Sequence, residues 1–195
     1  MSGKAMISEA LIQNALYREL AAKCAHVFPN MSTITLYEAD LIAITKSGYA
    51  YEYEIKLSLS DFRADLKKRE KHASLANEVK KIPYPHSWGK EREVWVRADA
   101  PTNPYEALRC QCYPHLRPKE FWYVVHGFSV PEGELPPYAG LMRYTDDKWK
   151  RFEIMKPAPT LKAEKVSADR ITIATRNIVY RYWTLRLKET LPGCL

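Results

Sequence analysis

Residues 36–57 constrain the fold most, because they are predicted to form two strands joined by a loop of defined length. Residues 36–45 and 49–57 are rich in β-branched and aromatic side chains, as strands are. The loop is Lys46-Ser47-Gly48, and a three-residue hairpin loop favours glycine at its last position, where φ is positive. The segment is therefore predicted to form an antiparallel hairpin with its turn centred on Ser47.

This turn fixes the register of the hairpin. Asp40 is predicted to face Glu54, and Glu38 to face Lys56, with opposed Cβ atoms roughly 4.5–5.5 Å apart. A slip of one residue would move Asp40 to the opposite face. One face is almost wholly apolar and is expected to pack on a helix; it carries Leu41, Ala43, Tyr49, Tyr51, Tyr53, Ile55 and Leu57. The other face carries Glu38, Asp40, Glu52, Glu54 and Lys56, with Ile42 and Ile44 toward the turn.

The four carboxylates on this second face repel one another, and either a proton on one of them or a divalent cation can offset their charge. Oxygen ligands in this number favour magnesium, manganese or calcium over zinc. Such an ion can activate water and offset charge on a phosphate, and Lys56 can orient that water or stabilise developing negative charge. A solvated ladder, with Glu38 and Lys56 as a surface ion pair, is the structural alternative, and spacing alone does not decide between them.

The remaining pattern predicts a mixed sheet flanked by helices, in the α/β class. Helices are expected over 7–26, capped by Ser8 and stopped by Pro29-Asn30, over 61–80, capped by Ser60, and over 169–188. Short strands are expected at 93–98, 121–126, 141–144 and 152–155, with a loop at 100–118 that holds one helical turn. We expect one domain over 1–147 and a basic extension over 148–195 packed on it.

The charge is concentrated in one part of the chain. The net charge of +7 arises in residues 148–188, which hold eleven basic and three acidic residues. A basic segment on a nearly neutral body is typical of contact with a polyanion, although a solvated basic helix has the same composition. No apolar run is long enough to span a bilayer, and the N-terminus lacks a secretion-signal pattern, so we expect a cytoplasmic protein.

The cysteines offer a competing metal site. Cys110, Cys112 and His115 lie close in sequence, and Cys24 with His26 would complete a zinc-binding set. Their spacing is not the usual two-residue gap, and Pro114 interrupts it. Small apolar residues near a loop are the simpler interpretation, and the sequence leaves metal binding there open.

The hairpin and the segment after it resemble the PD-(D/E)XK nuclease superfamily, the restriction-endonuclease-like fold. The resemblance rests on Asp40 and on Glu54-Ile55-Lys56 after a hairpin. It extends through 57–62 with Asp65, Lys68, Lys71 and His72, as in small bacterial and phage-encoded members. Similarity continues at 117–118, 121–125 and 137–141, so that residues 30–165 are covered, most specifically over 38–72.

This resemblance implies an αβββαβ core and a magnesium-dependent deoxyribonuclease, in which manganese can replace magnesium. Asp40, Glu54 and the carbonyl of Ile55 would bind the metal, and Lys56 would be the catalytic lysine. Members often add an acid from the first helix, here Glu9 or Glu19, and Glu38 is an alternative from the strand. The chain departs from the pattern in having Ala39, not proline, before Asp40.

Further residues are candidates for contact with nucleic acid. Phosphate contacts are predicted for Lys67, Lys68, Lys71, His72, Arg176 and Arg181. Asp61 is expected to favour its helix N-terminus, and Asp65 to pair with Lys68 or Arg69 at helical spacing. Unpaired bases can stack on aromatic side chains, for which Trp88, Trp95, Trp122, Tyr123, Trp149 and Trp183 are candidates. Those at strand positions, Trp95 and Trp122, are better explained as core residues.

Three functions remain open on this sequence. The first is metal-dependent DNA cleavage, in repair, recombination, restriction or phage DNA processing. The second is a non-catalytic nucleic-acid-binding protein or adaptor on the same fold, and the third is a protein–protein module. The intact set of Asp40, Glu54 and Lys56 favours the first. Substrate form, DNA or RNA, endo- or exonuclease action and a possible homodimer are not specified by the residues.

Overall fold

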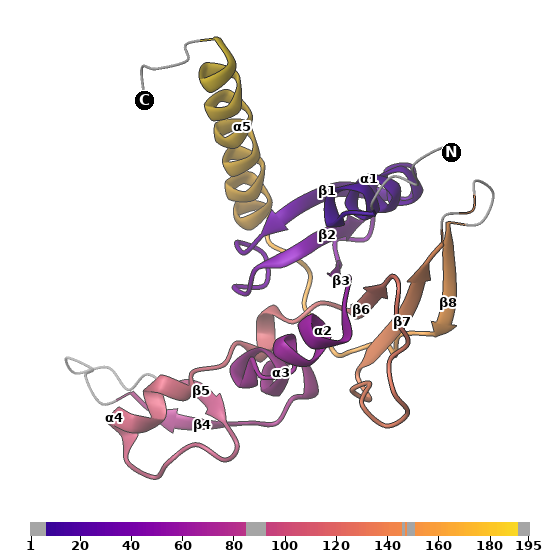
Figure 1. Ribbon diagram of the computed structural model, residues 1–195. Coiled ribbons are helices and arrows are strands. Elements are labelled where there is room, and N and C mark those ends of the chain that lie inside the picture. Colours follow the sequence, from indigo (N-terminus) through magenta and orange to yellow (C-terminus); the bar gives the residue numbers. More distant parts are fainter. Residues whose placement is uncertain (1–6, 85–92, 146, 148–150, 191–195) are drawn as a thin grey trace.

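A single mixed sheet forms the centre of the protein. The computed structural model describes residues 7–84, 93–145, 147 and 151–190. Within these ranges six strands pair in the order β1-β2-β3-β6-β7-β8 (Figure 1). Strands β3, β6 and β7 run parallel, and the other pairs are antiparallel. The strands are β1 (Cys24–Met31), β2 (Ala39–Thr45), β3 (Ala50–Lys56), β6 (Glu120–Val125), β7 (Ala139–Tyr144) and β8 (Phe152–Lys156).

Helices cover both faces of this sheet, which confirms the predicted α/β class. Helix α1 (Glu9–Leu20) lies on one face. Helices α2 (Leu59–Asp65), α3 (Arg69–Ala76) and the first half of α5 (Ala168–Thr190) lie on the other. A separate lobe follows α3 (Figure 1); it contains β4 (Val79–Pro83), β5 (Glu93–Arg97), α4 (Pro104–Ala107) and the 3-10 turn η1 (Leu108–Cys110), before η2 (Pro114–Leu116) leads to β6.

The hairpin adopts the predicted register. Leu41 pairs with Tyr53, and Ile42 with Glu52, which places Asp40 opposite Glu54. Gly48 has a φ of +89°, in the left-handed region that the loop requires. The apolar face packs on α1 as expected: Leu41, Ala43, Tyr53 and Ile55 share one buried cluster with Ile12, Ala15 and Leu16. The register prediction, on which the site hypothesis depends, is therefore confirmed.

The first predicted helix is too long. Helix α1 begins after its predicted cap Ser8, whose hydroxyl accepts from the amide of Leu11, but it ends at Leu20. Residues 24–31 instead form β1, with Val27 and Phe28 supplying the β-branched and aromatic character of a strand. Pro29 is tolerated because β1 is an edge strand, where a missing N–H removes no bond to a second neighbour.

The helix predicted over 61–80 is wrong in its continuity. The structure has two helices, α2 and α3, and Lys68 between them has a non-helical ψ of 73°. The apolar stripe is interrupted there, because residues 67–71 are all charged. The N-cap is Ser58, not Ser60, and Asn77, with a φ of +62°, ends α3 before the unpredicted strand β4.

The later elements follow the predictions closely. Strands β5, β6, β7 and β8, the helical turn at α4 and the final helix α5 all occur where they were expected. Strand β8 belongs to the main sheet, whereas the proposed boundary at 147/148 lies partly outside the described residues and stays a prediction. No helix in the described ranges is long and apolar enough to cross a membrane.

Candidate active site

Asp40, Glu54 and Lys56 meet at the hairpin, as the register requires. The Lys56 ammonium lies 2.9 Å from Glu54 Oε2 and 3.8 Å from Asp40 Oδ2. The backbone N–H of Ile55 donates to Asp40 Oδ2 at 2.6 Å, which fixes that carboxylate across the ladder. The side chain of Glu54 is 2% exposed and that of Asp40 19%, so Asp40 forms the solvent-facing side of the cluster.

The negative charge of Asp40 is only partly offset by the neighbouring Lys56. Burial, followed by repulsion from Glu54, raises the pKa of Asp40 to about 6, despite the opposing effect of Lys56. Burial lowers the pKa of Lys56, but attraction to Glu54 and Asp40 outweighs it and the pKa is raised. The ammonium of Lys56 therefore stays charged, but it lies 3.8 Å from Asp40, so the negative charge of Asp40 is only partly offset. A cation placed beside Asp40 would relieve that deficit.

A second lysine holds Glu54 from the opposite side. Lys71 extends from α3 to the sheet, where its ammonium lies 2.5 Å from Glu54 Oε1 and 3.4 Å from Glu52 Oε1. The side chain of Lys71 is 1% exposed. Burial raises the pKa of Glu52, and attraction to Glu52 and Glu54 raises the pKa of Lys71 in spite of its own burial. Each oxygen of Glu54 is thus held by a different lysine.

Asp65, at the end of α2, continues the network below Lys71. Tyr123 on β6 donates its hydroxyl to Asp65 Oδ2 at 2.8 Å, and the Lys68 ammonium lies 2.8 Å from Oδ1. Burial opposes ionisation of Asp65, but the interactions with His72 and Lys71 hold its pKa well below the usual range. The predicted pairing of Asp65 with Lys68 is confirmed. The network links α2, α3 and β6 to the strand that carries Glu54.

We expect Tyr123→Phe to lower the free energy of unfolding by about 1–3 kcal/mol, because it leaves a buried carboxylate without its hydroxyl donor. Tyr123 is fully buried, so the ring of phenylalanine fills the same space. Urea denaturation measures the effect. The control is Tyr105→Phe, at a tyrosine that is 58% exposed, which should change stability little. Equal effects of the two substitutions would contradict this role of Tyr123.

The structure separates the candidates for an additional acid. Glu9, at the start of α1, accepts from Gln13 Nε2, and the same amide donates to the carbonyl of Asp40 at 2.9 Å. Glu9 also raises the pKa of Asp40, after the larger effects of burial and Glu54. Glu38 is exposed and precedes β2, while Glu19 lies near the far end of α1. Gln13 was not anticipated, because no motif marks a helix side chain that reaches a strand carbonyl.

The predicted phosphate contacts have different surroundings. Lys67 and Lys68 are exposed, His72 is half-buried, and Arg176 is exposed on α5. Lys71 is buried among carboxylates, which suits positioning of Glu54 better than contact with a phosphate. Arg181 donates to the backbone carbonyls of Pro29 and Asn30, so it holds α5 against β1.

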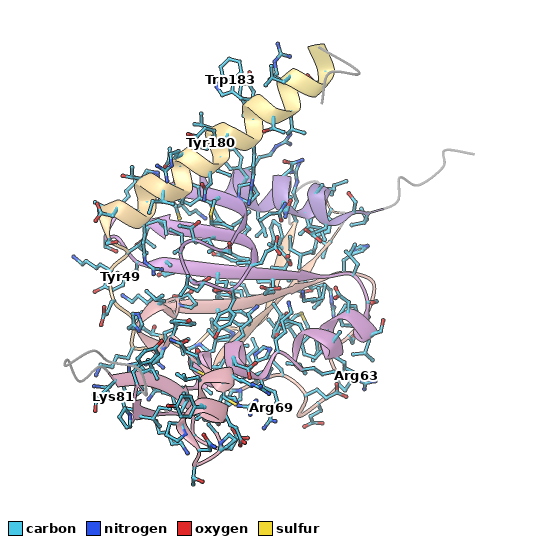
Figure 2. The ribbon with its side chains drawn as sticks, turned by 90° about the vertical axis from the view of Figure 1, so that its left-hand side faces the viewer. Tyr49, Arg63, Arg69, Lys81, Tyr180 and Trp183 are labelled. Carbon is cyan, nitrogen blue, oxygen red and sulfur yellow. The ribbon has the colours of Figure 1, made fainter. Side chains whose placement is uncertain are left out.

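The aromatic candidates also differ in exposure. Trp122 and Tyr123 are buried in the core, as expected for Trp122, and Trp95 packs beneath the Lys81 ammonium at 5.2 Å. Trp183 is 57% exposed. Figure 2 places Trp183 on the projecting part of α5 and Lys81 toward the other end of the molecule. Trp88 and Trp149 lie outside the described residues.

The described residues contain no cluster of side chains typical of a metal site. Among the described residues, no group of three or more histidine, cysteine, aspartate or glutamate side chains is placed to hold a metal ion. Within the described residues, no metal-binding group is therefore formed by Cys110, Cys112 and His115. Cys24 lies on β1 in the main sheet. Asp40 and Glu54 form a pair of carboxylates that share the Lys56 ammonium.

Comparisons with known proteins give the fold without a function. No protein-family model matches the chain, and no curated protein matches it. A solved structure from Silicibacter pomeroyi, the SPO1766 protein of unknown function, is similar over 98% of this chain and 97% of its own, with 14% identity and a TM-score of 0.51. This likeness supports the overall α/β architecture, and the function has to be argued from the site.

Proposed function

We propose that this protein is a magnesium-dependent deoxyribonuclease that hydrolyses phosphodiester bonds. The observation that supports this most directly is the meeting of Asp40, Glu54 and Lys56, with the ammonium between the two carboxylates. When the lobe between α3 and β6 is set aside, the order from α1 to β6 is one helix, three strands, a helical segment and a strand, as in the αβββαβ core that the sequence resemblance implies. The basic 148–188 segment is consistent with a polyanionic substrate.

The residues present fit a hard divalent cation. Asp40 and Glu54 offer carboxylate oxygens, which magnesium prefers. Burial and then repulsion from Glu54 raise the pKa of Asp40, and a cation beside it would oppose both effects. In this proposal both carboxylates would hold the ion, together with the Ile55 carbonyl that the resemblance implies. When bound, the ion would supply Lewis-acid activation of water and offset phosphate charge. Lys56 has to release Glu54 Oε2 for that oxygen to serve as a ligand.

The released ammonium of Lys56 then has a task in the reaction. Water forms a bond to phosphorus while a bridging P–O bond breaks, and the leaving oxygen takes up a proton. Lys56 can hold the attacking water or face the negative charge that develops on the phosphate. Lys71 remains on Glu54 Oε1 and keeps the carboxylate in place. Lys71 is therefore a positioning residue in this proposal, and Lys56 a catalytic one.

One observation favours the alternative, a non-catalytic nucleic-acid-binding protein on the same fold. Both oxygens of Glu54 are already engaged by lysines, so this residue is neutralised without any metal. A protein of that kind would bind DNA in a salt-dependent manner and cleave nothing. The partial exposure of the Asp40 side chain and the burial of Lys56 beside it favour the nuclease.

A cleavage assay separates the two functions. Wild type and Asp40→Asn are incubated with linear duplex, branched and single-stranded DNA, with RNA in parallel, in the presence of magnesium, manganese or EDTA. The nuclease is supported by cleavage that requires metal and that Asp40→Asn removes. Metal-independent activity, or an equal rate in Asp40→Asn, would contradict the proposal. DNA binding with no cleavage of any substrate would assign the adaptor function instead.

A further inference from the structure

Helix α5 extends beyond the body that it packs on. Ala174 is fully buried, and Ile171 and Ile178 pack on the cluster around Phe28 and Ile42. Arg170, Asn177 and Arg181 hold the same side of the helix to residues 29–34. Toward its C-terminal end the helix continues away from the sheet, as Figure 1 shows. Tyr182 and Leu185, which continue the apolar stripe, are 54% and 62% exposed.

The opposite side of α5 carries a second apolar stripe, which we call the outer seam. Its members are Ile173, Arg176, Tyr180, Trp183 and Leu187, spaced alternately by three and four residues. This spacing keeps side chains on one face of a helix and is the pattern by which two helices pack side by side. The four apolar members are 39–64% exposed, and Figure 2 shows Trp183 directed away from the sheet.

We propose that the outer seam is a dimer interface, in which α5 packs antiparallel against α5 of a second copy. The same surface then meets itself across a two-fold axis, as in most homodimers. The charges select the direction of packing. A parallel pair would place Arg176 against Arg176, whereas an antiparallel pair places it near Leu187 and sets Tyr180 against Trp183 of the partner helix. Antiparallel packing also aligns the helix dipoles favourably.

Nucleic acid is the other occupant that the composition suggests, but the arginines are mostly engaged elsewhere. Arg181 donates to Pro29 and Asn30, and Arg186 lies 3.3 Å from Glu189. The seam itself contains one cation among five residues. Packing of a second helix requires the alternating spacing of three and four residues, whereas contact with a DNA strand does not.

The exposed area predicts how tightly the copies associate. Tyr180 and Trp183 are 64% and 57% exposed. A large aromatic side chain buries roughly 150–250 Å², so the two leave about 100 Å² or more each for a partner. With Ile173, Leu187 and flanking atoms, the pair would bury about 1,000 Å² in total, near the lower limit of specific interfaces. We therefore expect a reversible dimer with a dissociation constant on the order of micromolar to tens of micromolar.

Light scattering coupled to size-exclusion chromatography tests this on the full chain, from about 1 µM to about 1 mM, a range that brackets the expected constant. The mass of wild type should rise to twice that of the chain, while Trp183→Glu should stay a monomer. The matched control is Ile154→Glu on β8, which is 59% exposed and should dimerise like wild type. Circular dichroism checks that Trp183→Glu keeps its helices. Wild type that stays monomeric would overturn the proposal, and so would a Trp183→Glu protein that dimerises. If wild type were monomeric and bound DNA, and Trp183→Glu removed that binding, nucleic acid would be the occupant of the outer seam.

The direction of packing has its own test. Arg176→Cys and Leu187→Cys proteins are mixed and oxidised, with wild type as the control for the natural cysteines. Antiparallel packing predicts a mixed disulfide between the two variants, identified by mass spectrometry. If the main product were Arg176→Cys linked to a second copy of itself, the antiparallel arrangement would be ruled out, because antiparallel packing keeps the two 176 positions far apart.

Discussion

Replacing Lys71 by methionine is expected to lower the free energy of unfolding by about 3–5 kcal/mol, the cost of removing one partner from a buried ion pair. Methionine fills much of the same space, so the loss reflects charge more than packing. Without the ammonium, Glu52 loses its cation and Glu54 retains Lys56 alone. Urea denaturation followed by circular dichroism measures the change. A drop of this size would make Lys71 one of the main determinants of stability.

Two further variants show whether the charge is the cause. Lys68→Met removes a lysine that is 55% exposed and also pairs with a buried carboxylate, and it should cost under about 1 kcal/mol. Combining Lys71→Met with Glu52→Gln removes one of the stranded carboxylates, and should recover part of the stability. Equal losses for Lys68→Met and Lys71→Met, or no recovery in the double variant, would mean that Lys71 acts through packing instead.

Under the proposed function, replacing Lys56 by methionine is expected to reduce the cleavage rate by about 10²–10³-fold or more, since it removes the charged group assigned to the reacting phosphate. The same substitution removes the ammonium that now holds Glu54 Oε2 and lies 3.8 Å from Asp40. Manganese should therefore bind Lys56→Met at least as tightly as wild type, which electron paramagnetic resonance or calorimetry can follow. Loss of cleavage with retained metal binding is the signature of a catalytic lysine.

The matched control is Lys81→Met, whose ammonium lies over the Trp95 ring on the β4–β5 lobe. Cleavage by this variant should equal that of wild type. The role assigned to Lys56 would be refuted by a Lys56→Met enzyme with an unchanged rate. It would also be refuted if metal binding and cleavage were lost together in a folded protein, because Lys56 would then support the metal ligands and not the reaction.

The parts of the fold that the sequence predicts well are those set by neighbouring residues. The loop ending in Gly48 fixes the register of β2 and β3, and the register alone brings Asp40, Glu54 and Lys56 together. The alternation of apolar residues similarly predicts which face packs on α1. These features depend on backbone geometry within a few residues, so no knowledge of the remaining chain is needed.

The features that the sequence does not reveal depend on long-range packing. Lys71 lies in a run of charged residues and was predicted to contact phosphate, but the break between α2 and α3 brings it to the buried Glu54 on the sheet. Tyr123 was a candidate for stacking on bases, and its bond to Asp65 forms only once β6 pairs with β3. Strand β1 was missed because the helical pattern of α1 continues into it and Pro29 suggested a stop.

The parallel pairing of β3 with β6 also sets the order in which the molecule assembles. Strands β1 to β3 are joined by short connections, whereas β6 returns to β3 only after residues 57–119. Closing so long a connection is entropically costly and makes parallel pairing slow to form. On a chain emerging from the ribosome, Glu52 and Glu54 are synthesised well before Lys71 and β6, and they face water as ordinary ions in the interval. During that time the β3 edge is open to strands of other chains. Its carboxylates, Glu52 and Glu54, repel an identical edge and so protect β3 from self-association until β6 pairs with it.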